Sequence, residues 1–407
     1  MTRDPTRRGV LRLGGTLLAA GTTVGLAGCS GGDGDGTPTG NDAESSSDAL
    51  DVVPAGATSV TYADIGGMLD DGTVEGLMNK MLSVANDSGE EAPTNKQELL
   101  TQFENRTGLD PNGMREMVGF GKTPEMGEGE TPAPDAVEAA AQYSGTWFTA
   151  DWSEDDLVNA VEESGEADVS LESSTYGEYT IYEPSSSGET MPEDGEMETP
   201  TTWLGVITDG EYVTGTEDAV SDALDVAAGD MDGVGSDLRD TYSGVRDGLA
   251  KMASSVPANL PEDMIPDESV GEGGENEVEV DPARLEELQG GAVTLYTEGD
   301  EMGLSASMTA GTEDAAQHVV DLIDGLIVSI EKNLQGAGQT ATPPEDLVTA
   351  LDNISVQRSG QSVSVEYTSD LESLNGLIEQ MAELFLVTGE HSPGADGSTT
   401  YGVSFPV

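Results

Sequence analysis

The chain has 407 residues, with 79 acidic and 15 basic side chains, a formal net charge of −64 and a single cysteine. This charge excludes nucleic acid as a natural partner, because phosphate binding needs clustered Lys and Arg. If the one cysteine is modified, disulfides, Cys-ligated zinc, iron–sulfur clusters and cysteine nucleophiles are excluded too.

Residues 1–28 have the features of an export signal, so they are set apart from the fold. Residues 6–12 read TRRGVLR, and residues 13–26 form a weakly apolar stretch rich in Gly and Thr. That stretch is too short for a membrane span, which needs about 20 mostly apolar residues. The segment ends in LAGC at residues 26–29.

These two motifs resemble known targeting signals. Arg7 and Arg8, with the apolar pair and the base behind them, resemble the twin-arginine export signal, although Val10 stands where Phe is more common. Residues 26–29 resemble a lipobox, in which a peptidase cuts before the cysteine and the thiol takes lipid. The resemblance implies a signal peptide at 1–28, a lipid anchor on Cys29 and a place on the outer face of the cell membrane.

Without residues 1–28, which hold four of the bases and one of the acids, the chain keeps 11 bases and 78 acids, a net charge of −67. High charge with few large apolar residues is typical of disorder, or of a folded protein that needs hydrated carboxylates in near-saturated salt. The periodic apolar residues described below favour the folded alternative. With the signal, the composition resembles surface lipoproteins of salt-loving archaea, many of which have no assigned activity. We expect diffuse contact with hydrated salt cations.

After a flexible tether at 29–50, the chain alternates expected strands and helices. A first strand is expected at 59–65. Hairpins are expected because short alternating runs flank Asp-Gly, Gly-Asp or Ser-Gly turns. The paired runs are 203–208 with 212–214, 292–297 with 302–308, and 354–357 with 362–367.

Each expected hairpin is followed by an expected helix with a polar cap. Thr216 and Thr312 begin the shared sequence Thr-Glu-Asp-Ala, and Ser153 begins a similar run, so each hydroxyl is expected to accept from a free helical N–H. Ser369 with Glu372 predicts a capping box. The helix after Thr312 and the helix after Ser369 are each expected to carry an apolar stripe on one face. The first stripe consists of Ala316, Val319, Val320, Ile323, Leu326, Ile327 and Ile330, and the second of Leu371, Leu374, Ile378, Met381 and Phe385.

The sequence therefore predicts an α+β fold of antiparallel sheets built from repeated hairpin–helix units, with helices on one face. Acidic stretches poor in apolar residues occur at 123–136, 184–200 and 257–282; the first two are expected to be long surface loops, and the third to be a domain boundary. The predicted division is an N-terminal α+β domain at 51–256, an acidic linker at 257–284 and a C-terminal α+β domain at 285–407.

No catalytic residue, cofactor or specific metal site is predicted. His318 and His391 are too few for a zinc hydrolase built on several histidines, and no Gly-x-Ser-x-Gly elbow or phosphate-binding loop occurs. The acidic pairs at 33–35 and 230–232 stop after two calcium-type ligands.

Three Asn-x-Ser/Thr acceptors are candidates for N-glycosylation: Asn86, Asn105 and Asn353. Asn86 is favoured, because its surroundings are expected to be exposed and polar.

The leading hypothesis is a non-enzymatic, lipid-anchored protein of the cell envelope with a structural or binding role. The alternative is a solute-binding lipoprotein of a transporter, although that class usually has two α/β lobes with buried parallel strands and an aromatic-lined cleft. An extracellular hydrolase is the third hypothesis.

The charge predicts that folding depends on salt. At about 0.1 M salt the screening length is about 10 Å, so neighbouring excess carboxylates repel one another, whereas at about 1 M it is about 3 Å. The repulsion opposes a net stability of only about 5–15 kcal/mol. Circular dichroism of residues 30–407 should show loss of helix on dilution from multimolar KCl to about 0.1 M, and recovery when salt is restored. A flat spectrum and melting temperature would contradict this prediction, and disorder at every salt concentration would favour the disordered alternative.

Overall fold

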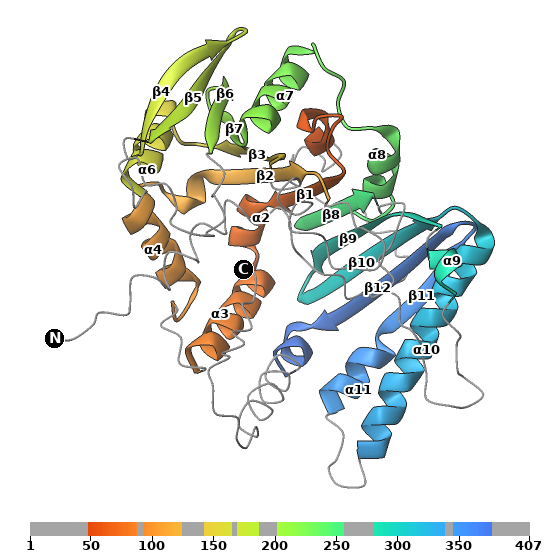
Figure 1. Ribbon diagram of the computed structural model, residues 1–407. Helices are drawn as coiled ribbons and strands as arrows, with labels where there is room; N and C mark the ends of the chain where they lie inside the picture. The colour runs from red at the N-terminus through yellow and green to blue at the C-terminus, as the bar shows by residue number, and fades with distance from the viewer. Residues whose placement is uncertain are drawn as a thin grey trace, which may run out of the picture.

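The computed structural model describes residues 48–87, 93–123, 142–164, 169–186, 202–255, 281–285, 287–337 and 345–376. These residues form an α+β fold around one sheet of twelve strands (Figure 1). The strand order is β11-β12-β10-β9-β8-β1-β2-β3-β7-β6-β5-β4. Every neighbouring pair in it is antiparallel.

The strands are short, and most neighbours in sequence are also neighbours in the sheet. They are β1 (Ser59–Asp64), β2 (Met114–Gly121), β3 (Ser144–Ala150), β4 (Val169–Tyr176), β5 (Tyr179–Ser186), β6 (Trp203–Thr208), β7 (Glu211–Gly215), β8 (Ala250–Ser255), β9 (Leu288–Glu298), β10 (Glu301–Ala310), β11 (Ile354–Ser359) and β12 (Ser362–Asp370). The three hairpins expected from the sequence are β6–β7, β9–β10 and β11–β12.

The helices connect the strands and cover the sheet. They are η1 (Asp48–Val52), α2 (Ile65–Asp70), α3 (Gly72–Asp87), α4 (Lys96–Thr107), η2 (Pro111–Gly113), α6 (Glu154–Ser164), α7 (Glu217–Ala228), α8 (Ser236–Ser243), α9 (Pro282–Leu285), α10 (Glu313–Ala337) and α11 (Glu345–Asp352). Residues 371–376 are also helical. Within the described residues, no helix combines the length and apolar composition that a membrane span requires.

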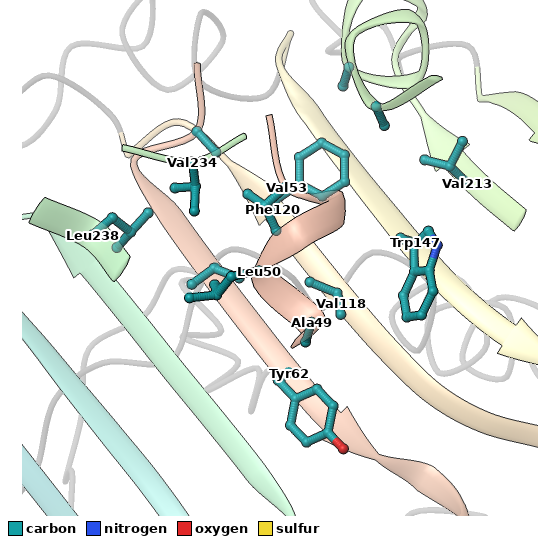
Figure 2. Close-up of a cluster of buried hydrophobic side chains, with 14 of the residues drawn as sticks. Ala49, Leu50, Val53, Tyr62, Val118, Phe120, Trp147, Val213, Val234 and Leu238 are labelled. Carbon is teal, nitrogen blue, oxygen red and sulfur yellow. The ribbon is translucent and has the colours of Figure 1, made fainter. Parts of the chain in front are cut away.

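One face of the sheet, called face A, carries Trp147 and the largest core cluster. Successive side chains of a strand point to opposite faces, so Val60, Val118 and Val213 reach the same side through their strand pairings. Leu50 of η1 packs into this cluster beside them (Figure 2). Helices α7 and α8 supply the rest of the cover, with Val220, Ala223, Leu224, Leu238 and Tyr242.

The opposite face, called face B, carries two separate clusters. Phe148 and Tyr212 meet α4 and α6 near one end of the sheet. Val363 and Val365 of β12 meet α10 near the other end. Helices therefore cover both faces, and the expectation of helices on one face is wrong. The physical reason is that strands such as β3 carry large apolar side chains at successive positions, Trp147 and Phe148, and both sides must be buried.

The predicted linker separates two strands that pair with each other. Strand β8 ends at Ser255, strand β9 begins at Leu288, and Ala253 lies opposite Ala292. One sheet thus runs through both predicted domains, and the division at 257–284 is not a division between two sheets. Residues 256–280 lie outside the described part of the chain, as do most of the predicted acidic loops.

The helix caps agree with the expectations only in part. Thr312 accepts from the N–H of Ala315 at 3.1 Å, and Ser153 accepts from the N–H of Asp156 at 3.2 Å, which confirms those two caps. Thr216 precedes α7 but makes no side-chain cap bond. Ser369 is not the cap either, because β12 continues one residue further and Asp370 takes that place, accepting from the N–H of Ser373 at 2.9 Å.

The apolar stripe of α10 is buried only over its first half. Ala316 is fully buried and Val319 is 5% exposed, whereas Leu326 is 51% exposed, so the predicted stripe is not buried along its whole length. The helix extends beyond the sheet it covers (Figure 1), because 25 residues span more than the width of β11 and β12. The predicted positions 378, 381 and 385 lie outside the described residues.

The tight packing of face A predicts a large effect from one methyl group. A Cβ atom on Gly145 would lie 2.4 Å from Cζ of Phe120, which is 2% exposed. Gly145→Ala should lower the free energy of unfolding by about 1–3 kcal/mol, the usual cost of overpacking. Gly72→Ala is the matched control, because its Cβ atom would meet nothing within 4 Å. Denaturant unfolding in multimolar KCl measures both, and equal stability of the two variants would contradict the packing of Phe120.

Candidate functional site

The strongest sequence-predicted sites lie outside the described residues. These are Arg7 and Arg8 of the export signal and Cys29 of the anchor, together with His391. The described residues contain the three glycosylation candidates and His318.

The three asparagines differ in accessibility. Asn86 lies near the end of α3 and is half-buried, and its side-chain nitrogen donates to the carbonyl oxygens of Leu82 and Pro93, both at 3.0 Å. The expectation that Asn86 is exposed is therefore wrong. Asn105 is exposed but lies within α4, whereas Asn353 is exposed in the turn between α11 and β11.

A hollow of about 360 Å³ lies between residues of the predicted N-terminal domain and residues of the predicted C-terminal domain. Its lining comes from the start of α3, from the β9–β10 turn and from the segment after β12. The lining residues are Asp71, Gly72, Thr73, Gly299, Asp300 and Leu371.

Asp71 is bound on several sides. Its Oδ1 accepts from the N–H groups of Thr73 at 2.7 Å and Val74 at 3.0 Å, so it caps α3. Its Oδ2 accepts from the hydroxyl of Thr297 at 2.7 Å, which ties α3 to β9. Asp300 is exposed on the turn. The described residues offer no group of three or more metal-ligating side chains, so the hollow can attract hydrated cations through charge but has no built coordination sphere.

Carboxylates elsewhere on the fold are held by aromatic donors. The hydroxyl of Tyr62 donates to Glu116 at 3.0 Å, and the indole N–H of Trp147 donates to Glu211 at 3.0 Å. Three more tyrosines donate in the same way. The pairs are Tyr143 with Asp222, Tyr176 with Asp225 and Tyr182 with Glu154.

These contacts keep the tyrosines protonated. Burial raises the pKa of Tyr62, and the charge of Glu116 adds to that rise. Burial and the hydrogen bond to Glu154 raise the pKa of Tyr182 to about 12. Each hydroxyl is therefore a permanent donor at neutral pH, and the pairs anchor structure rather than exchange protons.

Lys251 is a buried cation on β8, the strand that pairs with the first strand of the predicted C-terminal domain, β9. It lies on β8 between Tyr62 of β1 and Thr294 of β9, and its side chain is 3% exposed. Its ammonium group lies 3.1 Å from Asp247 and 4.3 Å from the ring centre of Tyr242. The ion pair and the ring satisfy the charge, so its role is to hold α8 and the loop after it on face A.

His318 is also committed to a structural contact. Its Nε2 atom accepts a hydrogen bond from the backbone N–H of Asp281 at 3.0 Å. While this hydrogen bond is made, Nε2 is not free to accept a proton as a general base.

Comparisons with known proteins place no family on this chain. No protein-family model and no curated protein matches it. Crystal form III of TP0453 is similar with a TM-score of 0.38 and 10% identity, over 81% of this chain and 97% of that chain. Crystal form I of TP0453 is similar with a TM-score of 0.35 and 12% identity, over 82% and 96%. Likeness at this level supports no conclusion about function.

The accessibility of the three asparagines predicts which one carries glycan. Asn353 presents its amide in an exposed turn, whereas the Asn86 amide would have to break two hydrogen bonds and leave its helix. Mass spectrometry of peptides from the native protein should find glycan at Asn353 and none at Asn86. Glycan on Asn86 with an unmodified Asn353 would contradict this prediction.

Proposed function

We propose that the protein is a lipid-anchored extracellular component of the cell envelope, exported through the twin-arginine pathway. One observation carries the proposal: Arg7-Arg8, a weakly apolar stretch and LAGC ending at Cys29 occur in that order at the start of the chain, and Cys29 is its one cysteine. Lipid on that thiol would supply about 0.8 kcal/mol per buried CH₂ group, and two chains suffice for stable attachment.

The role that we propose for the folded part is structural or binding, without catalysis. His318 is engaged by a backbone amide, and Lys251 is closed in by Asp247 and Tyr242. The hollow is lined by Asp71, which is already bound, and by the exposed Asp300. Among the described residues, His318, Lys251 and Asp71 are therefore engaged in structural contacts, which supports a non-catalytic role.

The alternative is a solute-binding lipoprotein of a transporter. That class places its ligand between two α/β lobes with buried parallel strands. The antiparallel pairing along the whole described sheet favours the envelope role over the transporter role.

We also propose that the fold is built from repeated hairpin–helix units and that its surface is acidic and hydrated. The hairpin β6–β7 leads into α7, β9–β10 leads into α10, and β11–β12 leads into the helical residues 371–376. We propose that these hairpin–helix units repeat one plan, and that the acidic stretches near 123–136 and 184–200 present carboxylates to salt cations as surface loops.

The tether sets how far the folded part stands from the membrane. Residues 30–47 separate Cys29 from η1. A fully extended chain of that length spans at most roughly 65 Å. Since lipid headgroups of like charge repel the acidic body, we expect the tether to hold it near the membrane without firm contact.

Variants of the signal test anchoring and export separately. Cys29→Ser should move the protein from the membrane fraction to the medium, or leave it unprocessed, because the lipid-bearing thiol is lost. Arg7→Lys with Arg8→Lys should strand the precursor inside the cell, because the paired guanidinium groups are lost while the charge is kept. Fractionation and immunoblotting of a tagged chain measure both outcomes.

Lys80→Arg, a change that keeps the charge outside the signal, is the control and should be exported and anchored normally. Membrane retention of a processed Cys29→Ser protein would refute the anchor. Normal export of the double lysine variant would indicate the general secretory route instead.

A further inference from the structure

His318 connects two helices that are far apart in the chain. It lies in the second turn of α10 and is half-buried, and its Nε2 atom accepts from the N–H of Asp281 at 3.0 Å. Asp281 begins the short helix α9, where its carbonyl oxygen accepts from the N–H groups of Arg284 at 3.1 Å and Leu285 at 3.4 Å. One imidazole nitrogen therefore holds the first turn of α9 against α10.

The rest of the contact is apolar. Leu285 packs against the second cluster of face B, and the partly buried Val320 and Ile323 of α10 pack against the same cluster. The contact between α9 and α10 therefore has two components. The apolar packing does not depend on pH, whereas the hydrogen bond to His318 depends on whether the imidazole is protonated.

The acceptor role fixes the protonation state of His318. A neutral imidazole has one N–H and one acceptor nitrogen, so Nε2 accepts only while the proton is on Nδ1. When both nitrogens carry protons, Nε2–H points at the N–H of Asp281, and two donors face each other. The bond cannot survive protonation.

Several charged side chains lie on the elements around His318. On α10 itself, Asp314 lies one turn before it and Asp321 one turn after it. On α9, the carboxylate of Asp281 is paired with Arg284 at 3.1 Å. The other elements that pack on α10 carry these titratable groups among the described side chains: Glu301 of β10, Arg358 of β11, Glu366, Tyr367 and Asp370 of β12, and Asp352 of α11.

We propose that His318 is a pH-operated latch: the neutral imidazole holds α9 on α10, and protonation releases it. The chain then gains a pH-dependent surface, because release of α9 uncovers Leu285 and the part of α10 beneath it. This role is independent of how the protein is exported or anchored.

Hydrogen exchange on the mature chain in multimolar KCl tests the latch. Protection factors of the amides of Asp281, Ala283, Arg284 and Leu285 are compared at about pH 8 and about pH 5, on either side of the range in which histidine titrates. The wild-type chain should lose about 3- to 10-fold in protection at the lower pH, the effect expected for one net hydrogen bond.

Two variants make the test specific. In His318→Gln the side-chain oxygen accepts at both pH values, so protection should stay the same. In His318→Leu no acceptor remains, so protection should be low at both. The amides of α7 are the internal control and should not change in any of the three proteins.

Unchanged wild-type protection at about pH 5 would overturn the latch. An equal loss in the His318→Gln variant would also overturn it, since the acid effect would then arise elsewhere. A parallel loss in α7 would show that acid unfolds the whole chain, which contradicts a local release.

Discussion

Carboxylates outnumber cationic side chains about five to one in this chain, so most carboxylates must be satisfied by neutral donors or by water. The described fold follows this constraint. Tyr62, Tyr143 and Trp147 hold acidic partners that a lysine or arginine would hold in an ordinary protein. Asp71 is held by two backbone N–H groups and a threonine hydroxyl. A hydrogen bond from a neutral donor loses less to salt screening than an ion pair does, because one partner has no net charge.

The positions of the aromatic donors show what those bonds achieve. Tyr143 and Tyr176 reach Asp222 and Asp225, which lie three residues apart on one side of α7. The same helix buries Val220 and Leu224 against face A. Small apolar side chains alone would fix α7 weakly, since each contributes little buried area. The two tyrosine bonds add direction to that contact, and their carboxylates remain near the surface where salt water can hydrate them.

Local patterns in the sequence predicted the parts of the fold that depend on neighbouring residues. The turn Glu298-Gly-Asp-Glu301 between alternating runs predicted the β9–β10 hairpin, because such turns permit a positive φ, as Gly299 shows at 68°. Capping by Thr312 followed from the same local chemistry. Ser369 failed as a cap because the hydrogen bonds of β12 continue to Asp370, and a strand boundary is set by its partner strand.

Contacts between residues that are distant in the sequence could not be predicted from local patterns. Helices on both faces follow from successive apolar residues such as Trp147 and Phe148, a signal that was present in the sequence but does not say which helix covers which side. The bond from Thr297 to Asp71 joins residues 226 positions apart, and the bond to His318 spans 37. No local pattern marks such pairs. Asn86 looked exposed because its neighbours are polar, yet its amide is used to fasten the segment around Pro93 to the end of α3.

The position of η1 determines where a membrane anchor would pull on the fold. Leu50 and Val53 are almost completely buried in the cluster of face A, and the carbonyl oxygen of Val53 accepts from the N–H of Val234 at 2.7 Å. Arg239 of α8 adds an ion pair to Asp51 at 3.1 Å. Force along the tether would therefore reach the centre of the sheet through α8 and its neighbours rather than peel an edge strand. A buried attachment of this kind resists local unfolding, because the first described element cannot detach without opening the largest core.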